Sequence, residues 1–239
     1  RDVLTLPDFV TPIGEPPALV GFFNQLKQEF VSARWLYFEG VDRDEVHLSD
    51  RGVLLYNTLD YPSLGLGVEK VKMAFRMSYS LLDKIAFFLN HYMKLGIPEK
   101  RISFRHVWRE KETGPVRAEF SASENWPFRG LYWLSKDLFE KDIKDLTEPD
   151  ARDLHELRNH LEHKYVKVHS MTVPAGPAAS SARDPFCDNL AHAVSRNDLE
   201  RRSLRLLKLA RAALIYLSLG MHKEEQRRRA GADADADAD

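Results

Sequence analysis

The sequence predicts an all-α fold, a helical bundle of about five main helices joined by long connecting loops. Two observations lead to this prediction. Apolar residues recur at three- and four-residue steps in several long segments, and proline or glycine stands near the ends of those segments. We expect a single helical domain over residues 16–226, an irregular lead-in over 1–15, and a disordered basic and Ala-Asp tail over 227–239.

The first two helices are predicted on either side of a long connection over residues 42–67. Pro17 fits the first turn of the first helix and Gly40 its exit, while Gly96 and Pro98 end the second. The apolar stripe of the first helix consists of Leu19, Phe22, Phe23, Leu26, Phe30, Ala33 and Tyr37. The stripe of the second consists of Val71, Ala74, Phe75, Ser78, Leu81, Leu82, Ile85, Phe88, Leu89 and Tyr92. Both helices are therefore expected to form core scaffold.

Residues 99–124 are expected to form a loop, with a short helix or hairpin within it as the alternative, and Trp108 from this segment fills a place in the core. Asn125 is the expected N-cap of a third helix, which ends near Asp142. The inward residues of that helix are Leu131, Leu134 and Leu138.

The last helix is predicted over residues 197–226, with Asn197 and Glu200 as a capping box. Between residues 204 and 219 its apolar side chains point nearly all the way round. We therefore expect the middle of this helix to be packed on several sides.

One more helix is predicted over Thr147–Ser170, before the last one. It begins at a capping-box pattern formed by Thr147 and Asp150, and it ends before a run rich in Pro, Ala, Gly and Ser over residues 173–184. Its apolar stripe consists of Leu154, Leu157, Leu161, Tyr165 and Val168. Because this stripe faces a core, the polar residues of the helix are expected to stand on a fixed platform.

Charge and cysteine content narrow the classes of function. The chain has 35 basic and 36 acidic residues, so no global field attracts nucleic acid, and RNA binding would need a local patch. The one cysteine, Cys187, excludes an internal disulfide and a cysteine-rich zinc site, which fits a cytoplasmic protein. No apolar run reaches the length of about 18 residues that a membrane span needs. The start at Arg1, without Met or a signal-peptide pattern, fits a piece of a longer chain.

Several other kinds of site find no support in the sequence. His155, Glu156 and His160 imitate the H-E-x-x-H zinc motif, but one extra residue turns the second histidine away from the first. Gly65 and Gly67 lack the third glycine and the preceding strand of a dinucleotide-binding loop. We therefore expect neither a cofactor nor a metal ion.

Arg158, Asn159 and His163 are the candidate catalytic residues. These residue types suit a metal-free cleavage of a phosphodiester, which needs a cation for developing charge, an orienting group and a proton carrier that titrates near neutrality. A competing interpretation is a surface pair of Arg158 with Glu162, a solvated His163 and a Tyr165 that belongs to the core.

The spacing of Arg158 and His163 raises a geometric question. At about 100° per residue they lie about 140° apart, so one straight helix cannot direct both at one small target. Arg158 could swing its long stem round, the helix could loosen near His163, or a second copy of the protein could complete the site. We favour the second copy and expect a homodimer.

Arg158, four further residues and His163, with Asn159 after the arginine and Tyr165 two residues after the histidine, form an R-x4-H-x-Y pattern. The pattern resembles the motif of the HEPN superfamily, the higher eukaryotes and prokaryotes nucleotide-binding domains. The upstream segments 80–85 and 131–138 look like those of a larger bacterial HEPN subfamily. The resemblance then covers most of residues 16–222.

This resemblance implies an HEPN-like helical bundle that acts as a metal-independent endoribonuclease on RNA, in defence, a toxin–antitoxin pair or a stress response. It implies that His163 carries the proton, Arg158 holds the phosphate and Asn159 orients either partner. Tyr165 would be a site of inhibitory modification, although its place in the stripe favours burial. An antitoxin or an upstream sensor domain would be a further partner. The alternative is a non-catalytic HEPN-like module that binds nucleotide, RNA or a protein.

Overall fold

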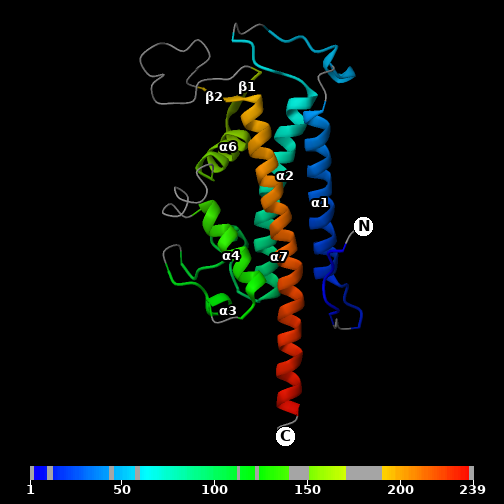
Figure 1. Cartoon of the computed structure of the whole chain (residues 1–239), viewed down its shortest axis with the longest axis vertical. Helices are drawn as coiled ribbons and strands as arrows, with labels where there is room; N and C mark the ends of the chain where they lie inside the picture. Colours follow the sequence, from blue (N-terminus) through cyan, green and yellow to red (C-terminus); the bar gives the residue numbers. More distant parts are fainter. Residues whose placement is uncertain are drawn as a thin grey trace. The chain divides into compact units, whose positions relative to one another are not determined.

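The computed structural model describes residues 3–9, 13–42, 46–56, 60–111, 114–121, 124–139, 151–170 and 190–236. Most of these residues are helical, which confirms the predicted fold class, and a small sheet adds to the helices (Figure 1). The helices are α1 (Ala18–Val41), η1 (Leu48–Asp50), α2 (Leu66–Tyr92), η2 (Glu99–Arg101), α3 (Ala118–Ser121), α4 (Trp126–Phe139), α6 (Ala151–His163) and α7 (Arg196–Ala236). The strands are β1 (Tyr165–His169) and β2 (Ala191–Ser195). None of the described helices is long and apolar enough to cross a lipid bilayer.

Contacts between residues group the chain into two compact units. Unit 1 consists of residues 1–29, 80–148 and 209–239, and unit 2 of residues 30–79 and 149–208. The boundary between the units falls inside α1, α2 and α7. The single domain expected over 16–226 therefore stays a prediction.

The apolar stripe of α2 is buried as predicted. Every residue of that stripe is at most 5% exposed, and Tyr92 is the most exposed of them. In α1 the stripe is narrower, because Phe23, Leu26 and Ala33 are buried while its other members are only half-buried. The α2 stripe thus contributes buried apolar residues to both units.

The core of unit 1 includes Trp108, as the sequence predicts. Its ring is 1% exposed, and its Nε1 donates a hydrogen bond to the Phe104 carbonyl oxygen at 2.6 Å. Asn125 caps α4, since its Oδ1 accepts the Phe128 N–H at 3.2 Å. Its amide nitrogen also donates to the Gly220 carbonyl oxygen on α7 at 2.8 Å.

Helix α7 departs from its prediction at both ends. It begins at Arg196, and its capping box consists of Ser195 and Asp198, because Ser195 Oγ accepts the Asp198 N–H at 3.1 Å and also donates to Asp198 Oδ2 at 3.0 Å. The predicted Asn197–Glu200 box is therefore wrong by two residues. The helix continues to Ala236, ten residues beyond its predicted end at 226 and into the tail predicted over 227–239. Arginine and alanine are good helix formers there, and Arg228 pairs with Glu225 one turn earlier at 2.9 Å.

Gly40 lies one residue before the end of α1, next to the helix exit that the sequence predicts, and it also allows a close approach to α2. It lies within α1, and a Cβ added there would stand 2.7 Å from the Gly67 carbonyl oxygen of α2. Glycine is needed because α1 and α2 approach each other closely at this point of unit 2.

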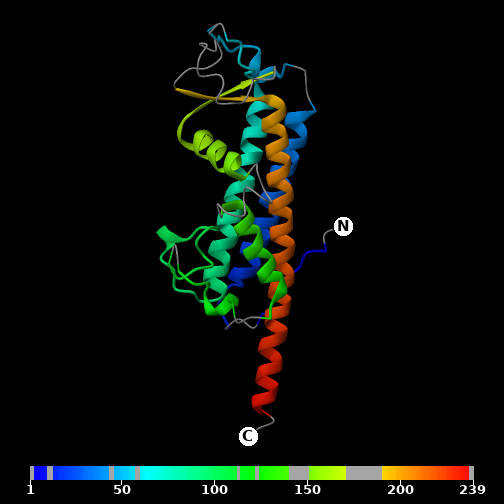
Figure 2. The ribbon, with the colours of Figure 1, turned by 60° about the vertical axis from the view of Figure 1, so that its left-hand side comes forward.

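The helix predicted over Thr147–Ser170 is wrong beyond His163. Helix α6 ends at His163, and Tyr165–His169 forms β1, which pairs in parallel with β2 (Figure 2). β-Branched and aromatic residues in β1 favour an extended backbone. The backbone hydrogen bonds of this strand are made with a partner strand that is distant in the sequence. The expected cap at Thr147–Asp150, the 173–184 run and Cys187 lie outside the described residues.

Strand β1 is anchored inside unit 2 by a buried ion pair. Lys167 Nζ lies 2.6 Å from Asp60 Oδ2, and the two side chains are only 8% and 6% exposed. The Ser63 N–H donates to the Val168 carbonyl oxygen at 2.6 Å. Both contacts tie β1 to the segment that precedes α2.

Candidate functional site

Helix α6 presents its polar motif on a buried apolar base, as the sequence predicts. Leu154, Leu157 and Leu161 are at most 4% exposed. The side chains of Arg158 and Asn159 are half-buried, while that of His163 is exposed. The three candidate catalytic residues therefore remain accessible while their helix is held by its apolar side.

The Arg158 guanidinium is positioned by two neutral groups. Its Nη1 donates a hydrogen bond to Asn159 Oδ1 at 3.1 Å, and its Cζ lies 5.5 Å from the centroid of the Tyr79 ring on α2. A cation over an aromatic face is attracted by the negative face of the ring. In the described part of the chain, no carboxylate pairs with Arg158.

The surface pair of Arg158 with Glu162 does not form. Glu162 Oε1 instead lies 3.9 Å from Nε of Arg76 on α2. Arg76 also donates a hydrogen bond from Nη2 to the Leu161 carbonyl oxygen. Carbonyls in the last helical turn lack partners within the helix, so Arg76 satisfies one of them and fixes the end of α6.

His163 is the last residue of α6. The Lys164 N–H still bonds to the His160 carbonyl oxygen at 3.0 Å, and the chain is extended from Tyr165 onward. Two of the three ways to bring Arg158 and His163 to one target have support: the Arg158 side chain bends towards Asn159, and α6 ends at His163. A second copy that completes the site stays a prediction.

A stacked pair of histidines lies beside the motif. The ring centroids of His160 on α6 and His192 on β2 are 4.3 Å apart, and the two ring planes are inclined by 26°. His160 Nδ1 lies 2.7 Å from the Glu156 carbonyl oxygen. Among the described residues, no group of three His, Cys, Asp or Glu side chains could hold a metal ion.

The prediction that Tyr165 is buried is wrong. Its side chain is 46% exposed, because Tyr165 is the first residue of β1 rather than part of a helical stripe. The Lys167 Nζ lies 5.6 Å from the centre of its ring. Tyr165 is thus open to solvent near the motif.

Two residues that contact the motif were missed by the sequence reasoning. Tyr79 supports Arg158, and Arg76 holds the end of α6; they stand three residues apart on α2. Arg76 and Tyr79 lie on the same face of α2, beside its apolar stripe. This shared face was the one feature of the sequence that could have indicated a contact with another helix. Their partner helix could not be identified from the sequence.

Comparison with known proteins gives one result. The model of the LA2681-like HEPN family matches residues 10–224, which is most of the chain. No curated protein and no solved structure matches.

Proposed function

The chain belongs to the LA2681-like HEPN family, and we propose that it is a metal-independent endoribonuclease whose catalytic residues are His163 and Arg158, with Asn159 positioning Arg158. The observation that carries the proposal is that the Arg158 guanidinium is held in place by neutral groups. Its guanidinium is held by Asn159 and Tyr79, neither of which neutralises its charge. On the same helix, His163 is exposed to solvent.

The proposed reaction uses the ribose 2′-hydroxyl of RNA as the nucleophile. A bond forms between the 2′-oxygen and phosphorus while the bond from phosphorus to the 5′-oxygen breaks. His163 takes the 2′-hydroxyl proton or gives a proton to the leaving 5′-oxygen, because imidazole titrates near neutral pH. The products are a 2′,3′-cyclic phosphate and a free 5′-hydroxyl.

Arg158 would stabilise the charge that develops on the phosphate oxygens. A planar guanidinium matches two phosphate oxygens at once and stays charged at every relevant pH. Asn159 contributes through its Oδ1, which accepts the hydrogen bond from Nη1 and leaves the other guanidinium nitrogens for phosphate. Asn159 is therefore a positioning residue for Arg158.

We further propose that two copies of the chain form the working enzyme. Arg158 and His163 leave α6 in directions about 140° apart, so an arginine from one copy and a histidine from the other would meet most simply. The exposed end of α6 leaves His163 accessible to such a partner. The cellular setting that fits this activity is a cytoplasmic defence or stress response, or a toxin restrained by an antitoxin.

The alternative function is a non-catalytic module that binds RNA, nucleotide or a protein. It would be favoured by a buried motif helix or by an Arg158 locked in an internal salt bridge. In the described residues Arg158 has no such bridge, and the motif side chains are accessible. The nuclease is therefore the function that the site supports best.

The test compares His163→Ala and Arg158→Ala with the native chain in RNA cleavage with excess EDTA. Loss of a positioned acid–base group should lower the rate by about 10² to 10⁴, and loss of Arg158 by about 10² or more. Matched controls are His91→Ala and Arg34→Ala, exposed residues with no side-chain partner in the described structure. Both controls should keep native activity.

A second substrate separates this chemistry from other nucleases. An RNA oligonucleotide with a single 2′-deoxy sugar at the cleaved position should stay intact there, because the nucleophile is missing. Full activity in both motif variants, or cleavage at the deoxy position, overturns the proposal.

A further inference from the structure

Unit 1 contains a cavity of about 750 Å³ that the proposed nuclease does not use. It is formed by η2, the loop that follows it and the start of the segment before α3. Its charged lining consists of five cations and one carboxylate, namely Lys100, Arg101, Arg109, Lys111, Arg117 and Glu110. The walls are therefore strongly basic, although the whole chain is nearly neutral.

The cations of this cavity differ from those that form ion pairs elsewhere in the described chain. Elsewhere Lys70 pairs with Glu39 at 2.7 Å, Lys84 with Glu29 at 2.5 Å and Arg196 with Glu200 at 2.8 Å. In contrast, Lys100, Arg101, Lys111 and Arg117 form no ion pair within the residues that the structure describes. No carboxylate among the described residues neutralises these four charges.

Arg117 gives the most specific indication. Its Nε is buried and has no hydrogen-bond partner among the described groups. A buried donor without a partner costs free energy, which a bound acceptor would recover. Beside it, Arg109 is fixed in place because its Nη1 donates to the Gly114 carbonyl oxygen at 2.8 Å.

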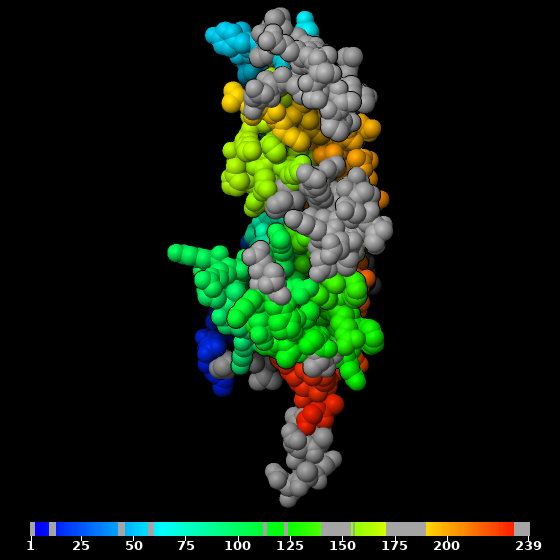
Figure 3. All heavy atoms as spheres, turned by 90° about the vertical axis from the view of Figure 1, so that its left-hand side faces the viewer, coloured from blue at the N-terminus to red at the C-terminus, as the bar shows by residue number. Residues whose placement is uncertain are grey.

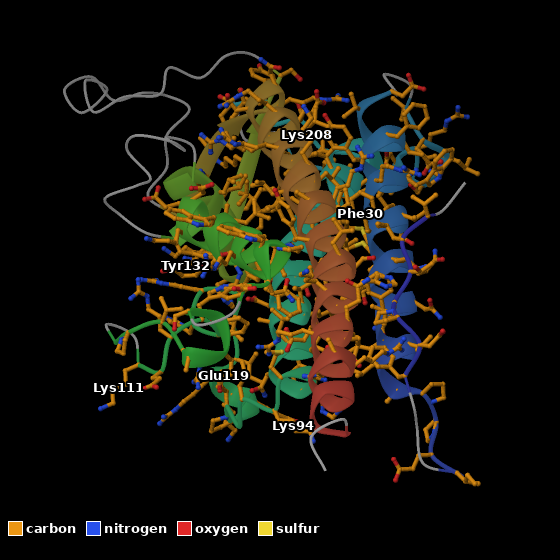
Figure 4. All side chains as sticks on the ribbon, turned by 60° about the horizontal axis from the view of Figure 1, so that its bottom comes forward. Phe30, Lys94, Lys111, Glu119, Tyr132 and Lys208 are labelled. Atoms are coloured by element: carbon orange, nitrogen blue, oxygen red, sulfur yellow. The ribbon has the colours of Figure 1, made fainter. Side chains whose placement is uncertain are left out.

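Like charges around a concave surface repel one another, and the low-dielectric walls concentrate their field. An anion that enters relieves this repulsion and gains charge-assisted hydrogen bonds, which are among the strongest in proteins. Figure 4 shows the Lys111 side chain extending outward from the loop before α3. In Figure 3 a narrow group of atoms in the green segment of unit 1 projects beyond its neighbours.

We propose that this cavity binds a small anion that carries two or more phosphate groups. A volume of about 750 Å³ is typical of sites for small organic ligands, which span about 300 to 1,000 Å³. Several cations around one cavity match a compact polyanion better than an extended strand, which a row of cations would follow. Arg109 and Arg117 would bind one phosphate, and Lys100, Arg101 and Lys111 would bind the next.

The experiment measures binding of inorganic triphosphate to the full chain by calorimetry. The test variant is R101Q/K111Q, and its matched control is R211Q/K223Q, which removes one arginine and one lysine that are exposed on α7 and outside the cavity. The affinity should fall about tenfold or more in the test variant and less than about twofold in the control. Arg117→Lys keeps the charge but loses the planar donor, and should weaken binding by a similar factor.

Three outcomes overturn the proposal. They are no binding by the native chain, equal losses in test and control variants, and a single-stranded RNA that binds at these residues without competition from triphosphate. The result does not depend on the nuclease, because His163→Ala and Arg158→Ala should bind triphosphate with native affinity. Binding can therefore fail while cleavage succeeds, or the reverse.

Discussion

Asn159 Oδ1 accepts a hydrogen bond from Nη1 of its chain neighbour Arg158 at 3.1 Å. Adjacent helical residues point about 100° apart, so this bond draws the long arginine side chain round towards the amide. Asn159 within the motif thus positions the Arg158 guanidinium.

Replacing Asn159 should therefore affect the reaction through Arg158. Asn159→Ala should lower kcat for RNA cleavage by about tenfold, because one charge-assisted hydrogen bond is worth about that factor. Asn159→Asp should be at least as harmful, since a carboxylate neutralises the guanidinium. Steady-state kinetics on both variants would check this order, and native kcat in Asn159→Asp would contradict it.

The Tyr79 ring gives a second test of how Arg158 is held. Tyr79→Phe keeps the ring face and should retain cleavage within about twofold, whereas Tyr79→Leu loses the cation–π contact and should lower kcat several-fold. Thermal unfolding of both variants serves as the control for packing, because Tyr79 is 8% exposed. Equal rates in the two variants would show that the ring does not position Arg158.

Mixing two inactive variants would reveal whether copies share a site. If Arg158 of one copy acts with His163 of the other, a dimer of Arg158→Ala with His163→Ala contains one intact site of two. Random exchange makes half of the dimers mixed, so about a quarter of native activity should return. A mixture that stays inactive, although native mass spectrometry shows mixed dimers, would place the whole site in one copy.

The buried pair of Lys167 with Asp60 should be important for stability. Lys167→Met removes the cation that lies 2.6 Å from the buried Asp60 carboxylate and should lower the free energy of unfolding by about 3 to 5 kcal/mol. The double variant Lys167→Met with Asp60→Asn should be less destabilised, since no charge is then isolated. Denaturant unfolding followed by circular dichroism measures both, and a harmless single variant would contradict the prediction.

Asp198 should make stability depend on pH at the start of α7. Burial raises the pKa of Asp198, but hydrogen bonds from Ser195 and Arg201 and the charges of Arg202 and Arg201 outweigh it, so the pKa is lowered. Because the pKa of Asp198 is lower in the folded state than in the unfolded state, the ionised carboxylate stabilises the fold at every pH above the unfolded pKa of about 3.9. This stabilisation is lost as the pH falls through the folded-state pKa. Asp198→Asn should therefore be less stable than the native chain at pH 7. That gap should close at acidic pH in parallel denaturant titrations.

The helices could be predicted because each carries its own evidence. The α2 stripe repeats along its whole length, and Asn125 stands where a cap is needed before α4. Residues 165–169 could not be assigned in the same way. Tyr165 and Val168 continue the three- and four-residue spacing of α6 by chance, and the strand forms because a partner more than twenty residues away completes it.

The candidate site was predictable only in part, for a similar reason. Arg158, Asn159 and His163 share a short motif that can be read along the chain. Tyr79 and Arg76 reach that motif from α2, through packing that no local pattern encodes. The basic cavity was missed because its cations are scattered between Lys100 and Arg117 and gather only when the loop folds.

The pairing of β1 with β2 offers a use in protein engineering. Because the strands run in parallel, Tyr165 is opposite Ala191 and His169 is opposite Ser195, so the chain leaves the ladder at one end and rejoins it at the other. The paired strands fix the positions at which the residues between β1 and β2 leave and rejoin the sheet. A fluorescent reporter inserted between β1 and β2 should therefore leave His163 and Arg158 on α6 undisturbed.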